Sequence, residues 1–212
     1  MPERKAAAKP AWLIPHGRPW EITASRPVYD NPWISVTESQ AVAPSGQLAP
    51  TYGVVRFKNL AVAVLPLHTD GTVTLVGQNR FPIADYSWEV PEGGAPLTED
   101  PLHAAQRELR EETGLLARDW RTVLPSLQLS NATTDERGIA FLAMDLEQGE
   151  TEPDDTEDLA LARVPFREAL DAALAGWMPD LLTVAVLLRA HHMAVEGELA
   201  PRLARRMLDG RE

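Results

Sequence analysis

The sequence predicts an α+β fold in which a mixed β-sheet lies between helices and is preceded by a β-rich N-terminal extension. Segments with strand-like alternation stand on both sides of one amphipathic helical segment, and the end of the chain is helical. This order of strands, helix, strands and helices is typical of a sheet covered by helices. The length of 212 residues, 44% of them hydrophobic, suits one domain with an elaboration. We place the extension at residues 1–58 and the main domain at residues 59–212.

Alternation and turn residues define the other elements. Residues 1–28 are interrupted by prolines and are expected to be irregular. Residues 61–66 and 72–78 are expected to form a hairpin of buried strands, and residues 147–158 an acidic loop. The remaining expected strands are 33–42, 51–57, 87–90, 120–129 and 139–146, and the remaining expected helices are 165–174, 179–193 and 201–208.

The central helix has clear start and stop signals. Asp100 is a helix-capping residue type, and Pro101 suits the first helical position. Gly114 suits a left-handed C-cap. At about 100° per residue, one apolar stripe of this helix should face the core. The stripe consists of Leu102, Ala105, Leu109 and Thr113.

Three carboxylates share the adjoining face of this helix. Glu108, Glu111 and Glu112 stand at i, i+3 and i+4. Arg107 relieves Glu111 from four residues away, whereas spacing alone offers no partner to the other two. A hard divalent cation would remove the repulsion, and carboxylates that leave room for water and substrate phosphates suit Mg²⁺. The alternative is a solvated acidic face, because charge runs usually face water.

The residues around the carboxylates favour the metal site. Gly93 and Gly94 permit a tight loop whose backbone carbonyls approach an ion. Glu99 is placed to pair with Arg107 and so to hold this loop against the helix. Loop, brace and carboxylates together predict a divalent-metal centre.

Composition excludes several function classes. The net charge of −11 argues against a nucleic-acid-binding protein, which needs basic surface. The absence of cysteine excludes disulfides, thiolate metal sites and a cysteine nucleophile, and is consistent with a cytoplasmic protein. We see neither a signal peptide nor a membrane-spanning segment, so no membrane partner is expected.

The segment from Gly93 to Leu115 resembles the signature box of the Nudix hydrolases, enzymes that cleave nucleoside diphosphates linked to another moiety. The match is Gly93, five residues, Glu99, seven residues and the run from Arg107 to Leu115. Nudix domains are similar to the fold predicted above. The N-terminal strands and the helix containing residues 181–185 resemble the subgroup that acts on ADP-ribose and other nucleoside diphosphate sugars.

The resemblance assigns roles to the box residues. Glu108, Glu111 and Glu112 are implied to bind Mg²⁺, with Mn²⁺ as the alternative cation, together with the backbone carbonyl of Glu92. Glu112 is also implied to be catalytic. Gly93, Glu99 and Arg107 are implied to form the structural brace.

Residues outside the box receive roles from the same resemblance. Arg80 resembles the arginine that clamps the pyrophosphate, for which a guanidinium fork is suited; the alternative is a surface arginine at a strand end. Glu136 closes a loop that in ADP-ribose hydrolases typically reads Ser-Pro-Gly, but here Asn131 and Ala132 replace the proline and the glycine. Glu136 is either a residue that contacts the substrate or the metal, or a turn carboxylate.

The acidic loop has two interpretations, a solvated charge run or the source of the general base. In the subgroup, a loop at this place supplies a carboxylate that deprotonates the attacking water. Asp155 and Glu157 match that position best, and Glu157 could instead bind a metal.

The sequence therefore predicts Mg²⁺-dependent hydrolysis of a nucleoside diphosphate sugar, with ADP-ribose giving AMP and ribose 5-phosphate as the leading reaction. GDP-mannose or another nucleoside diphosphate derivative is the alternative substrate. A non-catalytic nucleotide-sugar sensor is the alternative of another class. The subgroup also implies a homodimer that the N-terminal strands help to form and whose two chains share each active site. The alternative is that residues 33–57 extend the sheet within one chain.

Overall fold

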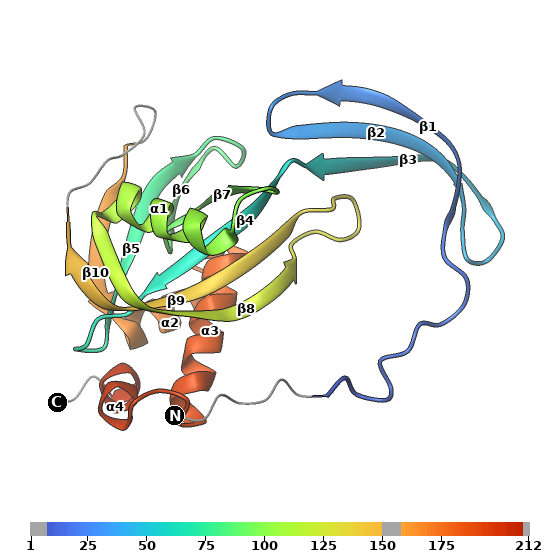
Figure 1. The fold of residues 1–212 in the computed structure, drawn as a ribbon. Coiled ribbons are helices and arrows are strands. Elements are labelled where there is room, and N and C mark those ends of the chain that lie inside the picture. Colours follow the sequence, from blue (N-terminus) through green and yellow to red (C-terminus); the bar gives the residue numbers. More distant parts are fainter. Residues whose placement is uncertain (1–7, 150–157, 210–212) are drawn as a thin grey trace.

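The structure is a computed structural model that describes residues 8–149 and 158–209. Its strands and helices are arranged in three sheets with four helices (Figure 1). The strands are β1 (Glu21–Asp30), β2 (Ile34–Val42), β3 (Leu48–Phe57), β4 (Asn59–Pro66), β5 (Thr72–Arg80), β6 (Asp85–Glu89), β7 (Glu92–Pro96), β8 (Leu115–Gln128), β9 (Arg137–Gln148) and β10 (Ala160–Pro165). The helices are α1 (Pro101–Thr113), α2 (Phe166–Leu174), α3 (Leu181–Val195) and α4 (Pro201–Asp209).

The central sheet is mixed and has the strand order β7-β4-β9-β8. β4 and β9 run parallel, while the other pairs are antiparallel. Alternate residues of β4 enter two cores: Val62 and Val64 belong to the cluster that includes α1, and Ala63 and Leu65 belong to the cluster that includes α2, α3 and α4. The prediction of a mixed sheet between helices is confirmed, because α1 covers one face and α3 the other.

The predicted hairpin of residues 61–66 and 72–78 is wrong. β4 and β5 lie in different sheets. The turn after β4 is joined to the start of β5 by a bridge between Leu67 and Val73 and by a hydrogen bond from the His68 N–H to the Thr72 carbonyl at 2.9 Å. Both edges of β4 are already paired with β7 and β9, so β5 pairs instead with β6 and β10. The sequence does not predict β10, because its six residues, Ala-Leu-Ala-Arg-Val-Pro, show no alternation of apolar and polar side chains.

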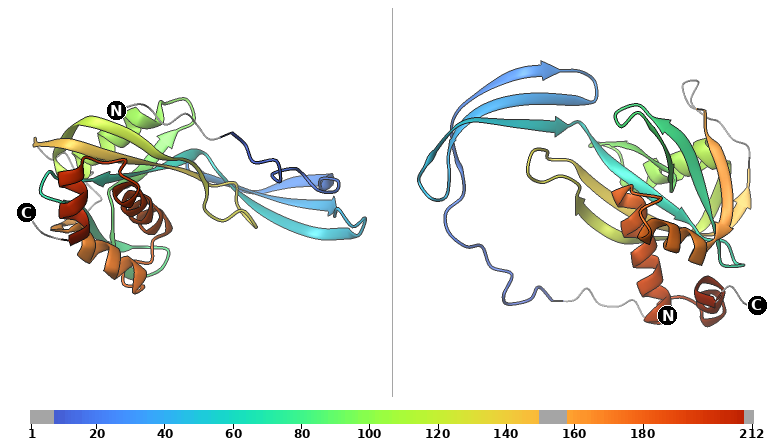
Figure 2. Two further views of the ribbon diagram at one scale, coloured as in Figure 1. Left: turned by 90° about the horizontal axis from the view of Figure 1, so that it is seen from below. Right: turned by 180° about the vertical axis from the view of Figure 1, so that it is seen from behind.

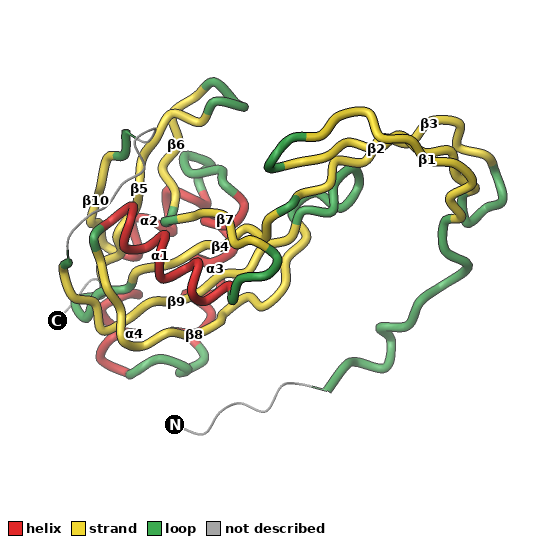
Figure 3. The backbone as a smooth tube through the Cα atoms, turned by 45° about the horizontal axis from the view of Figure 1, so that its top comes forward, coloured by secondary structure: helices red, strands yellow, loops and turns green. Residues whose placement is uncertain are grey.

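The expectation that residues 1–28 are irregular is wrong for residues 21–28, which belong to β1. β1 is an edge strand of the sheet β1-β2-β3, and Pro27 stands at a register shift there. An edge strand at a bulge tolerates proline, which explains why proline did not prevent a strand. Figures 2 and 3 show this N-terminal sheet projecting from the body of the molecule.

The N-terminal sheet contacts the body through β3. The Val55 N–H donates to the Thr133 carbonyl at 2.9 Å, and the Asp135 N–H donates to the Val55 carbonyl at 3.2 Å. Arg56 also pairs with Asp135 at 3.2 Å. The loop between β8 and β9 is therefore fastened to β3. Among the described helices, none has the length and apolar character to cross a membrane.

Candidate active site

The helix α1 forms as its capping residues predict. The Asp100 side chain accepts a hydrogen bond from the Leu102 N–H at 2.9 Å, Pro101 is the first helical residue, and Gly114 has a φ of 68°. The buried residues are Ala104, Ala105, Leu109, Glu112 and Thr113. Glu112 is only 5% exposed, although it is one of the three carboxylates of the predicted acidic face.

Two carboxylates of α1 lie against the segment that contains the glycines. The Glu92 N–H donates to Glu112 Oε2 at 3.2 Å. The Glu108 carboxylate lies so close to Gly93 that a Cβ at that position would overlap it. Gly93 is required by this close approach, because any side chain would occupy the place of the Glu108 carboxylate.

Arg107 holds the glycine strand β7 to α1. Its Nη1 donates to Glu99 Oε1 at 2.6 Å, and its Nη2 donates to the Gly94 carbonyl at 3.1 Å. It also lies 3.1 Å from Glu108 and 3.7 Å from Glu111. The structure contains the expected Glu99–Arg107 pair, and it gives Glu108 a positive neighbour that the spacing had not suggested.

Arg80, at the end of β5, forms a two-pronged pair with Glu89 of β6. Its Nε lies 3.2 and 3.0 Å from the two carboxylate oxygens, and its Nη2 also donates to Oε2. Burial lowers the pKa of Arg80, but the hydrogen bond with Glu89 and the charges of Glu89, Glu92 and Glu112 outweigh it and raise the pKa above its ordinary value. Arg80 therefore keeps its charge beside the carboxylates of α1 and β7.

The Glu92 side chain lies close to two other acidic groups, Asp180 and Glu89. Its Oε1 accepts a hydrogen bond from the Thr183 hydroxyl at 3.3 Å. Desolvation, followed by the charge and hydrogen bond of Asp180 and the charge of Glu89, raises its pKa well above the ordinary value, against an opposing effect of Arg80. The predicted site includes only the backbone carbonyl of Glu92, and the structure adds the Glu92 side chain to it.

Glu89 and Asp180 are site residues that the sequence reasoning missed. Glu89 alternates with Ser87 on β6, and both are buried, which is an unusual pattern for polar residues on a strand. Asp180 precedes the apolar helix α3 and accepts from the Thr183 N–H at 2.7 Å as its N-cap. A capping signal was present in the sequence, but it gave no indication of the site.

A groove of about 440 Å³ lies beside this cluster and is lined by Arg80, Pro82, Ile83, Ser87, Glu89, Pro179, Asp180 and Leu181. It combines one guanidinium with two carboxylates and an apolar rim. This mixture is suited to a ligand that has both a charged and an apolar part.

Glu136 lies near the start of α3. Desolvation, followed by the charge of Asp180, raises its pKa. Gly138 permits this approach, because a Cβ there would lie 2.9 Å from a methyl carbon of Leu182. The structure therefore brings Glu136 toward Asp180, while Asp155 and Glu157 lie outside the described residues.

The described residues can hold a divalent cation by a sparse set of ligands. No three acidic or histidine side chains within residues 8–149 and 158–209 form a ready-made cage. Mg²⁺ is usually bound through one or two carboxylates, with waters and substrate phosphates completing its coordination. Glu108, which lies against Gly93, and Glu112, which accepts from the Glu92 N–H, fit that requirement.

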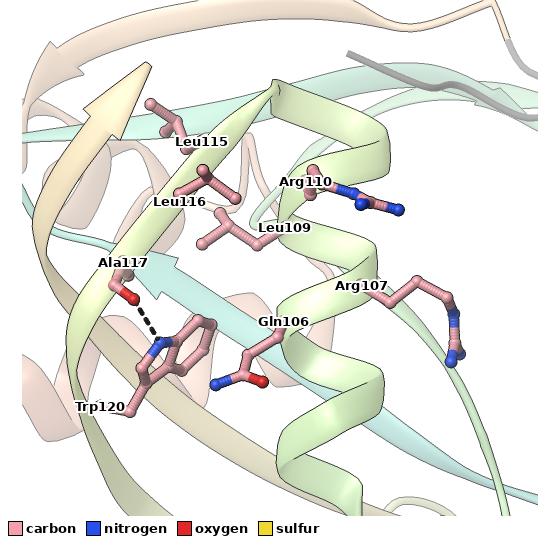
Figure 4. A pocket seen from close by; sticks show the side chains of 8 residues that line it. All are labelled: Gln106, Arg107, Leu109, Arg110, Leu115, Leu116, Ala117 and Trp120. Atoms are coloured by element: carbon pink, nitrogen blue, oxygen red, sulfur yellow. Dashed lines mark hydrogen bonds between the residues drawn. The ribbon is translucent and has the colours of Figure 1, made fainter. Parts of the chain in front are cut away.

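A second pocket, between α1 and β8, does not belong to this site. Figure 4 shows Leu109, Leu116 and Trp120 facing it, while the Arg107 side chain extends away on the other side of the helix. The Trp120 indole N–H already donates to the Ala117 carbonyl at 3.0 Å. Gln106 and the arginines Arg107 and Arg110 also line this pocket, but Arg80, Glu92 and Glu112 are not among its lining residues.

Comparisons with known proteins match both parts of the chain. A family model described as the NUDIX domain matches residues 57–184, and one described as the nucleoside diphosphate sugar hydrolase N-terminal domain matches residues 20–55. The chain is 30% identical over 175 residues to a Mycobacterium tuberculosis protein named ADP-ribose pyrophosphatase, covering 81% of this chain and 83% of that one.

Two further relatives extend over most of the chain. A Mus musculus protein named ADP-sugar pyrophosphatase is 27% identical over 191 residues, covering 82% of this chain and 87% of that one. The solved structure of an ADP compounds hydrolase aligns with a TM-score of 0.76 and 20% identity, over 88% of this chain and 100% of that one. This last likeness shows a shared fold.

Proposed function

This chain belongs to the Nudix family and is a hydrolase of pyrophosphate bonds. From that premise we propose that it hydrolyses a nucleoside diphosphate sugar. The leading substrate is ADP-ribose, cleaved to AMP and ribose 5-phosphate. The match of residues 20–55 to the N-terminal domain of nucleoside diphosphate sugar hydrolases supports the substrate class. The names of the relatives from M. tuberculosis and M. musculus support an ADP-linked sugar.

The observation that carries this proposal is the position of Arg80. Its guanidinium lies close enough to Glu92 and Glu112 for their charges to raise its pKa. A diphosphate bound by Arg80 would therefore lie beside the carboxylates proposed to hold the metal. Glu89 occupies the Nε–Nη2 edge of the guanidinium, and the remaining edge is the part proposed to contact phosphate.

Divalent metal ions are generally used by Nudix hydrolases, and we propose Mg²⁺ here, with Mn²⁺ as the alternative. Glu108, Glu111, Glu112 and the backbone carbonyl of Glu92 would hold it. When bound, a divalent ion neutralises charge on the diphosphate and activates the attacking water.

Residues of the chain itself position the substrate and deprotonate the attacking water. Arg80 positions the diphosphate, and Glu136 contacts the substrate from the loop that is fastened to β3. A carboxylate of the acidic loop, Asp155 or Glu157, accepts the proton of the attacking water. Little covalent chemistry is required, because positioning and electrostatics supply most of phosphoryl-transfer catalysis.

We also propose that the protein is a homodimer that uses the N-terminal sheet. This sheet exposes large apolar side chains, among them Trp33, which is 66% exposed, and Ile22, Val28, Tyr29 and Leu48. Exposed apolar surface of this kind is a common mark of an interface.

The experiment that tests the function is a substrate panel with a matched pair of variants. The protein is incubated with Mg²⁺ and, separately, ADP-ribose, GDP-mannose, UDP-glucose and a dinucleoside polyphosphate, and products are separated by chromatography. We expect AMP to appear fastest from ADP-ribose. Glu112→Gln should lower kcat by at least about 100-fold, since it alters the proposed metal centre, whereas exposed Glu168→Gln on α2 should not.

Other results would change the assignment. Faster cleavage of another substrate would keep the hydrolase and replace ADP-ribose. Binding of nucleotide sugars without metal-dependent cleavage would favour the sensor, and an unchanged Glu112→Gln variant would remove the proposed metal centre.

A further inference from the structure

Thr183 connects the first turn of α3 to the segment that leads into the glycine strand β7. Its hydroxyl accepts a hydrogen bond from the Val90 N–H at 3.0 Å and donates one to Glu92 Oε1 at 3.3 Å. A threonine hydroxyl has one proton to donate and can accept as well. Because the Val90 N–H can only donate, the hydroxyl proton is available for Glu92.

The position of Thr183 is itself fixed from two sides. Asp180 Oδ2 accepts from the Thr183 backbone N–H at 2.7 Å, which caps α3. The next residue toward the cap, Leu182, packs closely against Gly138 of β9. Thr183 is fully buried, so its hydroxyl has a single packed environment.

A single residue, Glu92, links Thr183 by hydrogen bonds to the Glu112 carboxylate of α1. Glu92 accepts from Thr183 through its side chain and donates through its backbone N–H to Glu112 Oε2 at 3.2 Å. Thr183 therefore contacts the same short segment, Val90 to Glu92, that positions Glu112 and carries the backbone carbonyl assigned to the metal.

We propose that Thr183 is a positioning residue for the metal centre, acting through Glu92. This inference rests on the proposed metal-dependent hydrolysis. Groups that orient metal ligands through hydrogen bonds commonly change metal affinity by about 10- to 100-fold when they are removed. The alternative is that Thr183 only satisfies the buried Val90 N–H, in which case its loss lowers stability and nothing else.

Thr183→Val tests the two interpretations, because valine keeps the shape and removes the hydroxyl. Mn²⁺ binding is followed by the electron paramagnetic resonance signal of free Mn²⁺ in the absence of substrate, and thermal unfolding is measured in parallel. We expect Thr183→Val to weaken Mn²⁺ binding by about tenfold. Thr183→Ser retains the hydroxyl and should restore binding.

Thr74→Val is the matched control. Thr74 is also a buried threonine, 7% exposed, and its hydroxyl lies 2.8 Å from His68 Nε2, outside the site. This control should lower the melting temperature and leave Mn²⁺ binding unchanged. If Thr183→Val does not fold, Thr183→Ala, which also removes the hydroxyl, replaces it in the same comparison.

The outcomes separate this inference from the function on which it rests. The positioning role alone is overturned if Thr183→Val binds Mn²⁺ as well as the wild-type protein does, while Thr183→Val and Thr74→Val lose stability alike. A Thr183→Ser variant as impaired as the valine variant also overturns it. Wild-type protein that binds no Mn²⁺ overturns the proposed function and the positioning role together.

Discussion

Replacing Gly93 with alanine should separate folding from catalysis in this protein. A Cβ at position 93 would overlap the Glu108 carboxylate, well inside the 3.4 Å at which ordinary contact begins. Gly93 does not have the positive φ that favours glycine, so the effect is steric and not conformational. The overlapping atoms are the far end of a flexible side chain, which can move at little cost to the fold.

The size of the functional effect follows from the displacement. To relieve the overlap, the Glu108 carboxylate must withdraw by roughly 1 Å, and a misplacement of this size can cost about 100-fold in rate. That factor corresponds to about 2.7 kcal/mol of transition-state stabilisation. Overpacking that cannot relax costs about 1–3 kcal/mol of folding free energy, and we expect the lower end because the side chain can rotate away.

The assay combines kcat at saturating metal with thermal unfolding. Gly94→Ala is the matched control: a Cβ there would lie 3.1 Å from Asn59 Nδ2, a milder contact on another element. We expect Gly93→Ala to fold and to lose about 100-fold in kcat, while Gly94→Ala stays close to wild type. The double variant Gly93→Ala with Glu108→Gln should be no slower than Glu108→Gln alone, because both changes act on one group. Full activity of Gly93→Ala would refute the assignment of Glu108 to the metal centre.

Two further predictions concern Glu92 and assembly. The pKa of Glu92 is raised in the folded protein, so its contribution to stability is greatest below its ordinary pKa of 4.5 and is lost as the pH rises through the folded pKa. Glu92→Gln should therefore raise the melting temperature of the metal-free protein more at pH 8 than at pH 5. An equal effect at the two pH values would contradict the raised pKa. The proposed homodimer should show twice the chain mass of 23.3 kDa by light scattering at micromolar concentration, and a mass of one chain would contradict it.

The sequence predicted those features that depend on residues close together in the chain. The capping residues and apolar stripe of α1 were predictable because helix ends and helical faces are set within a few residues. The pairing of Glu99 with Arg107 was predictable for the same reason, since Arg107 follows Glu99 by only eight positions. The fold class followed from the order of such elements.

Contacts between distant segments were not predictable in this way. Thr183 and Glu92 are 91 residues apart, and neither carries a local pattern that indicates the other. Glu89 appeared to be one residue of a short strand, and its pairing with Arg80 depends on the register of β5 with β6. The incorrect hairpin of β4 and β5 has the same origin, because competition from β7 and β9 for β4 is visible only in the assembled sheet.

The charges around Arg80 give the metal of the proposed function a second role. Arg80 lies among Glu89, Glu92 and Glu112, and Asp180 adds a further negative charge beside Glu92. One guanidinium, already paired with Glu89, cannot outweigh this field for a diphosphate that is itself an anion. A divalent cation held by Glu108 and Glu112 would reverse the local charge where the diphosphate must bind. The cation would then be needed to bind the substrate as well as to activate water, which accounts for how so acidic a protein can take an anionic substrate.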